Sequence, residues 1–162
     1  MTATSVRVRP ADLSGEDAVF VGAAVRDYLV QTEVEKAAEG VPGASGSLPE
    51  RYLPEVEDPC TAYAGHEVLV AEVDGAAAGV VVRNPGDAVS EIKRLWAAPE
   101  FRGRGVGSAL LDAAIADSAG DVRLTVWEWR AAAIGLYESR GFARVESGDH
   151  RERLLCFVRS RA

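Results

Sequence analysis

The 162-residue sequence has few of the residues that mark disulfide-rich, metal-binding or membrane proteins. With two cysteines, Cys60 and Cys156, and two histidines, it carries no disulfide framework and no CxxC pair for zinc. No stretch approaches the roughly 18 apolar residues that a membrane-spanning helix requires. The segment Met1–Arg9 also lacks the apolar core of a signal peptide, which favours a cytoplasmic location.

Dense clusters of lysine and arginine are missing as well, which argues against binding to nucleic acid or to an anionic membrane. The net charge is −7, from 25 acidic and 18 basic side chains. Residues 1–90 carry 15 acidic and 6 basic side chains, whereas residues 91–162 carry 10 acidic and 12 basic ones. The two halves are therefore expected to handle partners of different charge.

The length and composition predict one globular domain spanning residues 1–162. The expected class is α/β (α+β), a mixed and mostly antiparallel central sheet with helices on both faces, in the order β-α-α-β-β-β-α-β-α-β-β. Alternating apolar residues, and the glycines and prolines that interrupt them, predict the elements. Strands are expected at 5–9, 67–73, 77–83, 90–97, 123–129, 142–146 and 153–158, and helices after the N-cap Ser14, within 48–63, at 103–119 and at 130–140.

The most informative segment is a glycine-rich turn between a strand and a helix, with the sequence Pro-Glu-Phe-Arg-Gly-Arg-Gly-Val-Gly-Ser at residues 99–108. Its glycines let backbone N–H groups approach a ligand closely, and the helix start adds unpaired donors and a positive dipole end. Arg102 and Arg104 can add charge-assisted hydrogen bonds. The turn therefore predicts a site for a phosphate or pyrophosphate.

Two well-known phosphate motifs do not fit this turn. A P-loop requires a Gly-Lys pair, which the sequence lacks, and a Rossmann fingerprint requires glycine where Ser108 stands. The pattern [Q/R]-x-x-G-x-[G/A] fits residues 102–107 in full. A capped helix start with surface arginines is the alternative interpretation.

Together with a second block of residues, this turn resembles the GNAT family of acetyl-CoA-dependent N-acetyltransferases. The segment Glu91–Ala97, followed by Pro99, resembles the strand before the family's CoA loop. The second block resembles the family's LxV…NxxAxxLYxxxGF pattern and consists of Leu124-x-Val126, Ala133, Leu136-Tyr137 and Gly141-Phe142. The resemblance covers residues 91–142.

The resemblance implies acetyl-CoA as co-substrate and assigns residues to it. The backbone of the turn, Arg102, Gly103, Arg104, Gly105, Val106, Gly107 and Ser108, would hold the pyrophosphate. The end of the preceding strand, at Leu95 and Ala97, would hydrogen-bond the pantetheine arm. Arg130 occupies the position of the family's usual asparagine, and we expect it to reach a phosphate or the adenosine instead.

Tyr137 and Glu91 are the candidate acid and base. By its position in the second block, Tyr137 would protonate the departing thiolate, although a core aromatic is the alternative because it shares an apolar stripe with Ala133 and Leu136. Glu91 stands eleven residues before Arg102, a spacing that resembles family members with a strand glutamate as base. An ion pair with Lys93 is its structural alternative.

The remaining polar and aromatic candidates carry weaker predictions. We expect His66 and His150 at the surface and Cys156 in the core, which argues against a ping-pong route through cysteine. Trp127 and Trp129 are expected to pack in the core or to line the acceptor pocket. No metal site is expected.

The function predicted from these residues is acetyl transfer to a primary amine by direct attack in a ternary complex. The alternatives are a non-catalytic acyl-CoA-binding regulatory module and a nucleotide-binding domain. Residues 31–74 carry ten acidic and two basic side chains, which predicts a cationic small-molecule or peptide amine as acceptor. A homodimer is compatible with the family, but no segment of the sequence specifies an interface.

Overall fold

Seven strands build the central sheet of the protein, which is described from a computed structural model over residues 5–161. Met1–Thr4, the start of the segment tested for a signal peptide, and Ala162 lie outside the described residues. The strands are β1 (Val6–Pro10), β2 (Glu67–Val73), β3 (Ala76–Asn84), β4 (Val89–Ala97), β5 (Asp121–Trp127), β6 (Ala143–Val145) and β7 (Leu154–Arg159).

The helices follow the predicted order, with one segment more broken than expected. They are α1 (Asp17–Ala38), α2 (Leu53–Glu57), α3 (Pro59–Ala62), α4 (Val106–Ala116) and α5 (Ala131–Ser139), with 3₁₀ turns at Glu50–Tyr52 and Pro99–Phe101. The single helix expected within 48–63 is three short pieces, because Pro49 is the N-cap of the first piece and Pro54 and Pro59 stand in the first turns of the other two. None of the helices described within 5–161 is long and apolar enough to cross a membrane.

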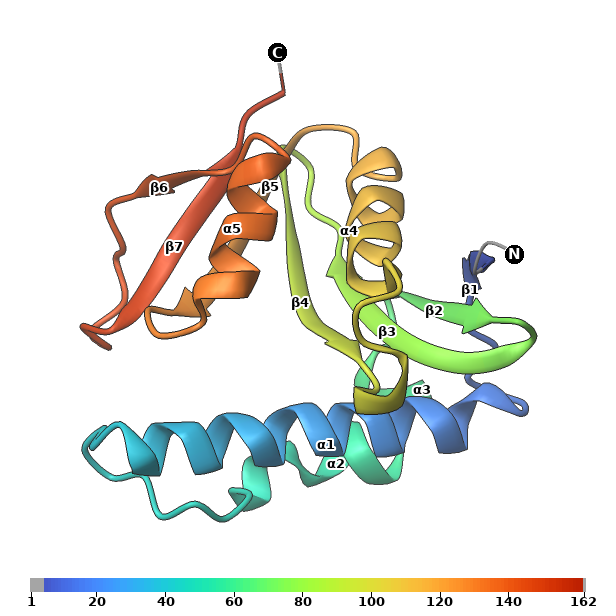
Figure 1. Ribbon diagram of the computed structural model, residues 1–162, viewed down its shortest axis with the longest axis horizontal. Helices are drawn as coiled ribbons and strands as arrows, with labels where there is room; N and C mark the ends of the chain where they lie inside the picture. The colour runs from blue at the N-terminus through green and yellow to red at the C-terminus, as the bar shows by residue number, and fades with distance from the viewer. Residues whose placement is uncertain (1–4, 162) are drawn as a thin grey trace.

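The sheet has the strand order β1-β2-β3-β4-β5-β7-β6, and every neighbouring pair is antiparallel except β4 with β5. Helix α1 covers one face, and α4 and α5 cover the other (Figure 1). Side chains of β3 alternate accordingly, with Val80 and Val82 buried against α1 and Val81 buried against α4. The predicted mixed sheet with helices on both faces is confirmed.

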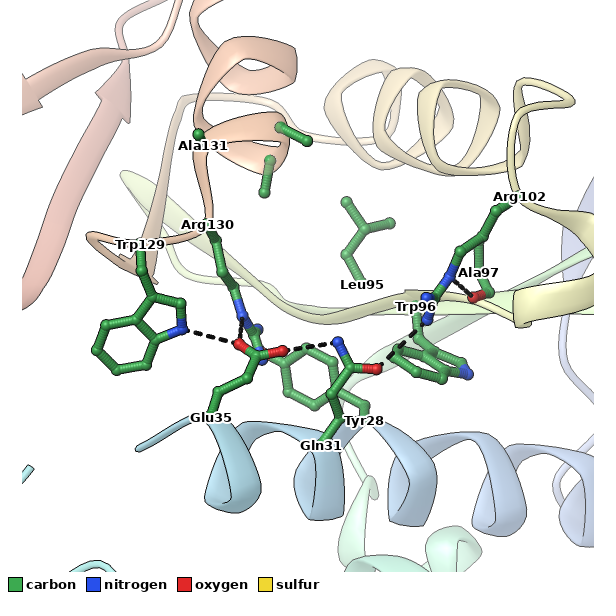
Figure 2. Close-up of a pocket in the computed structure, with 12 residues that line it drawn as sticks. Tyr28, Gln31, Glu35, Leu95, Trp96, Ala97, Arg102, Trp129, Arg130 and Ala131 are labelled. Atoms are coloured by element: carbon green, nitrogen blue, oxygen red, sulfur yellow. Dashed lines mark hydrogen bonds and ion pairs between the residues drawn. The ribbon is translucent and has the colours of Figure 1, made fainter. Parts of the chain in front are cut away.

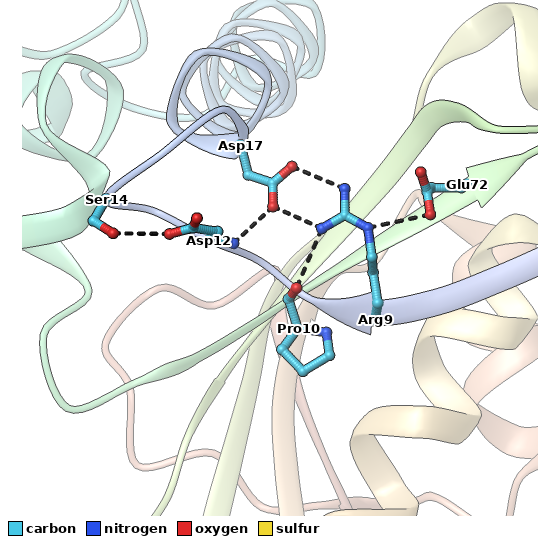
Figure 3. Close-up of polar contacts among 6 residues, drawn as sticks. All are labelled: Arg9, Pro10, Asp12, Ser14, Asp17 and Glu72. Atoms are coloured by element: carbon cyan, nitrogen blue, oxygen red, sulfur yellow. Dashed lines mark hydrogen bonds and ion pairs between the residues drawn. The ribbon is translucent and has the colours of Figure 1, made fainter.

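A buried carboxylate, rather than the expected serine, fixes the start of α1. The Ser14 hydroxyl donates to Asp12 Oδ1 at 2.8 Å, and the helix begins at Asp17 without a side-chain cap. The Asp17 carboxylate accepts from Nη1 and Nη2 of Arg9 at 2.7 and 2.9 Å and from the backbone N–H of Asp12 at 2.7 Å (Figure 3). Arg9 Nε donates to Glu72 Oε1 at 3.1 Å. This network ties β1, β2 and α1 together.

Replacing Asp17 by asparagine is expected to destabilise the protein by about 1–3 kcal/mol at pH 7, because it removes a charge-assisted pair from a buried position. The hydrogen bonds from Arg9 lower the pKa of Asp17, burial opposes them, and the N–H of Asp12 lowers the pKa further. A carboxylate whose pKa is lower in the folded state stabilises the protein at pH values above its unfolded-state pKa of about 3.9. This stabilisation is lost as the pH falls through the folded-state pKa. In urea unfolding, the difference in the free energy of unfolding between the wild type and Asp17→Asn should therefore shrink below about pH 4.

The matched control for this prediction is Asp27→Asn on the exposed side of α1. It should lower the free energy of unfolding by less than about 0.5 kcal/mol both at pH 7 and below pH 4, as surface substitutions usually do. An equal loss in both variants, or a loss for Asp17→Asn that persists unchanged at pH 2, would contradict the account of this network.

Candidate active site

Strands β4 and β5 separate after a short stretch of pairing. They pair in parallel only from Val89–Glu91 to Asp121–Arg123. On its other side, β4 contains a bulge in which Arg94 and Leu95 stand opposite the single residue Val81, and Arg94 has a φ of 58°. Among the described residues, the backbone of β4 beyond Glu91 therefore has no strand partner on the side of β5, and this edge is open to a ligand.

The glycine-rich turn lies directly after this open end of β4. Gly103 and Gly105 have φ values of 81° and 82°, and a Cβ atom at either position would meet nothing within 4 Å. The backbone angle, not crowding, is therefore what requires glycine there. Within the described chain, the six N–H groups of residues 103–108 donate to no protein acceptor. These free donors and the N-terminus of α4 form an anion-binding arrangement.

The guanidinium groups of the two arginines in the turn lie over neighbouring aromatic rings. Arg102 donates from Nε to the Ala97 carbonyl at 3.1 Å, and its guanidinium lies 4.5 Å from the centre of the Trp96 ring (Figure 2). Its Nη2 reaches Gln31 Oε1 at 3.5 Å. Arg104 lies over the Phe101 ring at 5.7 Å. Arg102 thus holds the end of β4 and does not extend the row of free N–H groups.

A cavity of about 560 Å³, the first cavity, lies between α1, the end of β4 and the start of α5. Four of the residues predicted to bind the cofactor line it, namely Leu95, Ala97, Arg102 and Arg130. This volume lies within the range of small-molecule and cofactor sites. The structure thus brings together the end of β4 and the start of α5, which the sequence places more than thirty residues apart.

Arg130 connects α5 to α1 at the wall of the first cavity. It donates from Nε to Glu35 Oε1 at 2.8 Å and from Nη2 to Thr32 Oγ1 at 2.7 Å. Trp129 Nε1 and Gln31 Nε2 also donate to the Glu35 carboxylate (Figure 2). Burial alone would raise the pKa of Glu35, but these three donors lower it. The Arg130–Glu35 ion pair joins α1 to α5, and the contact of Arg130 with a phosphate or the adenosine stays a prediction.

Tyr137 lies on α5, about two turns after Arg130. It lines a second cavity of about 170 Å³, and Leu95, Arg130 and Ala133 line both cavities. The Tyr137 side chain is 8% exposed, and burial raises the pKa of its hydroxyl. The ring packs 5.9 Å from Phe142, whereas the hydroxyl has no hydrogen-bond partner among the described residues and is not sealed from solvent. The tyrosine is thus a core aromatic whose residue also lines a cavity, and its role as the acid stays a prediction.

The structure does not place Glu91 beside Tyr137. Glu91 pairs in register with Arg123, before β4 and β5 separate, and it lines neither of the two cavities. Its negative charge instead contributes to the raised pKa of Arg123, whose largest cause is the hydrogen bond to Cys156. The role of Glu91 as the base stays a prediction.

Helix α1 supplies site residues that sequence reasoning missed. Tyr28, Thr32 and Glu35 line the cavities from one face of the helix. Their spacing of four and three residues is the available signal, because such residues share a helix face. The sequence pattern sets no end for this helix, and none of the three is among the predicted site residues.

The weaker predictions have separate outcomes. His150 is exposed and Cys156 is buried, as expected, whereas His66 is half-buried against the Tyr63 ring at 5.8 Å. Trp127 and Trp129 stack at 5.0 Å, and each lines one of the cavities. Among residues 5–161, no group of three or more metal-ligating side chains is present.

The acidic excess of residues 31–74 is largely neutralised within the fold. Six of its ten carboxylates form ion pairs with arginine or lysine, namely Glu33, Glu35, Glu39, Glu55, Glu67 and Glu72. Of the ten, Glu35 lines the first cavity and Glu33 the second. The cationic acceptor therefore stays a prediction that depends on two paired carboxylates.

The sequence profile of the acetyltransferase (GNAT) family matches residues 33–142. The chain belongs to the GNAT family. The matched region contains the open end of β4, the glycine-rich turn and Tyr137, and it begins within α1. The resemblance drawn from residues 91–142 is confirmed and extended toward the N-terminus.

Solved structures of other GNAT proteins share the fold. An acetyltransferase from Staphylococcus aureus Mu50 has a TM-score of 0.67 at 14% identity, covering 96% of this chain and 99% of the other. The PaiA N-acetyltransferase of Thermoplasma acidophilum, in complex with coenzyme A, has a TM-score of 0.66 at 16% identity, covering 97% and 99%. A GNAT acetyltransferase from Elizabethkingia anophelis with acetyl-CoA bound has a TM-score of 0.65 at 15% identity, covering 96% and 98%. No curated protein matches the sequence.

Proposed function

We propose that this GNAT protein transfers the acetyl group of acetyl-CoA to a primary amine by direct attack while both substrates are bound. The observation that carries the proposal is the row of six free N–H groups at residues 103–108, next to a cavity whose walls continue to Tyr137. Two structures with this fold hold coenzyme A or acetyl-CoA, which supports an acyl-CoA as co-substrate.

The residues present fit the pyrophosphate and pantetheine parts of such a co-substrate. The free N–H groups and the dipole of α4 favour an anion at the turn, and Arg104 adds positive charge close to it. The unpaired edge of β4 at Leu95 and Ala97 can hydrogen-bond an extended amide-bearing chain, as an added strand would. Arg102 fixes this edge through its bond to the Ala97 carbonyl.

The proposed chemistry needs a proton donor and a base: Tyr137 donates a proton to the departing sulfur, and a base removes a proton from the amine. The amine nitrogen bonds to the thioester carbon of acetyl-CoA, and the carbon–sulfur bond breaks as the Tyr137 hydroxyl donates its proton to the sulfur. The new amide nitrogen then gives up its second proton to the Tyr137 oxygen, which restores the hydroxyl. An alkylammonium with a pKa of about 10 must lose a proton before its nitrogen can attack. Glu91 is the candidate base. Because it lies in the paired part of β4, before β4 and β5 separate, a water molecule must carry the proton from the amine to its carboxylate.

Thermal unfolding with ligands tests the binding half of the proposal. Coenzyme A at about 100 times its Kd should stabilise the protein by about 2.7 kcal/mol, which corresponds to roughly 5–10 °C in Tm for a domain of this size. ATP and NAD at the same concentration should leave Tm unchanged. An equal shift with ATP or NAD would favour the nucleotide-binding alternative, and a shift with coenzyme A but no turnover would favour the non-catalytic acyl-CoA-binding module.

A further inference from the structure

The charged side chains that line the second cavity are mostly cationic. Lys36, Arg94, Arg130 and Arg151 line it, and Glu33 is the one carboxylate among its lining residues. The arginines are held by carboxylates that do not line this cavity: Arg94 by Glu55, Arg130 by Glu35 and Arg151 by Asp149. The three arginines therefore line the cavity, while the carboxylates that pair with them are not among its lining residues.

Arg94 is held in this position by its backbone and by its neighbours. Its φ of 58° is rare for a residue with a side chain and is maintained only where the surroundings enforce it. Nε and Nη2 donate to the two oxygens of Glu55 at 2.9 and 3.1 Å, and the Tyr63 hydroxyl donates to Glu55 Oε1 at 2.6 Å. The guanidinium also lies 5.5 Å from the centre of the Tyr52 ring. The side chain is thus pre-oriented at the cavity wall.

Arg151 provides a second oriented guanidinium from the loop between β6 and β7. Nε and Nη2 donate to the Asp149 carboxylate, and these bonds lower the pKa of Asp149. In both Arg94 and Arg151, the described hydrogen bonds to carboxylates use Nε and Nη2 and leave Nη1 for a ligand. Planar guanidinium groups recognise carboxylates by such directed, charge-assisted bonds.

We propose that the acceptor carries a carboxylate close to its amine, and that Arg94 and Arg151 bind this carboxylate while the amine faces Tyr137. The inference rests on the proposed acetyltransferase function and narrows its acceptor. A cavity of about 170 Å³ has the liquid volume of about six water molecules, which suits a free amino acid. The cationic acceptor predicted from the acidic excess is the opposite expectation.

Matched acceptors test this proposal in the wild-type protein. Release of free thiol from acetyl-CoA is measured with the common amino acids, with the carboxamide of each, and with polyamines. The best amino acid should exceed its own carboxamide in kcat/KM by about 10–100-fold, because a hydrogen bond to a charged group contributes about 1.5–3 kcal/mol. In a dipeptide with an N-terminal aspartate, the carboxylate close to the amine belongs to the side chain. This acceptor therefore distinguishes recognition of a side-chain carboxylate from recognition of the α-carboxylate of a free amino acid.

Variants show whether the two arginines carry this preference. Arg94→Gln and Arg151→Gln should each reduce the ratio of amino acid to carboxamide toward one, while coenzyme A still raises Tm. Arg151 has 47% of its side chain exposed, so its substitution should preserve folding even if Arg94→Gln does not. Arg26→Gln, at an exposed position of α1, is the control and should leave the ratio at its wild-type value.

The outcomes separate the inference from the proposed function. Turnover of carboxamides or polyamines that equals or exceeds that of amino acids would overturn the carboxylate site and leave the acetyltransferase intact. An amino-acid preference that survives both arginine substitutions would overturn the assignment of Arg94 and Arg151. No turnover with any acceptor, despite stabilisation by coenzyme A, would overturn both proposals.

Discussion

Replacing Tyr137 by phenylalanine is expected to lower kcat at least about 100-fold, the lower end of what a positioned general acid contributes. The substitution removes a hydroxyl that has no described protein partner and keeps the ring against Phe142. The free energy of unfolding should therefore change by less than about 1 kcal/mol. Steady-state thiol release with a saturating amine measures kcat, and stabilisation by coenzyme A shows whether the variant still binds it.

The raised pKa of Tyr137 adds a pH criterion to this prediction. Burial disfavours the phenolate, so the hydroxyl stays protonated beyond its ordinary pKa of about 10 and can donate throughout the physiological range. The rate should rise with pH as the amine or its base deprotonates, and Tyr137 should cause no decline below about pH 10. A Tyr137→Phe variant with the kcat and pH profile of the parent would show that the residue serves only for packing.

Replacing Gly105 by alanine is expected to raise the Kd of coenzyme A by at least about 10-fold. Gly105 is the N-cap of α4 with a φ of 82°, and a residue with a Cβ atom in this left-handed region costs about 1–2 kcal/mol. Because the surrounding space is open, the strain is relieved by rotation of the backbone, which turns the free N–H groups away from their common target. Isothermal titration calorimetry with coenzyme A measures the effect.

Gly75→Ala is a matched control for this substitution. Gly75, in the turn between β2 and β3, has a φ of 84°, and a Cβ atom there would also meet nothing within 4 Å. The two variants should lose similar stability, but Gly75→Ala should bind coenzyme A with the wild-type Kd. Equal affinities for the two variants would contradict the role of the glycine-rich turn in binding the pyrophosphate.

Much of the sheet could be predicted from local signals. The bounds of β2 agree with the alternating segment 67–73, because the turn at Asp74-Gly75 ends it clearly. The end of α1 could not be predicted in this way, because residues 31–38 are mostly polar and show no apolar stripe. They remain helical in a tertiary context in which Glu35 pairs with Arg130 and Glu33 is buried beside Lys36.

The candidate site was predictable where backbone chemistry decides it. The turn at residues 103–105, where we expected backbone N–H groups to be exposed, contains two glycines with positive φ, and Leu95 and Ala97 lie at a cavity wall. Side-chain directions were not predictable, because they depend on partners far away in the chain. Arg102 and Arg130 both contact residues of α1, and the sequence around either arginine contains no sign of those contacts.

The central claim is acetyl transfer from acetyl-CoA to an amine, and one measurement tests it most directly. The purified protein is incubated with acetyl-CoA and the panel of amines, and free thiol and the N-acetylated product are quantified in the same reaction. The account predicts equal amounts of both with at least one amine, and a loss of both in Tyr137→Phe. Stabilisation by coenzyme A without N-acetylated product from any amine would contradict it.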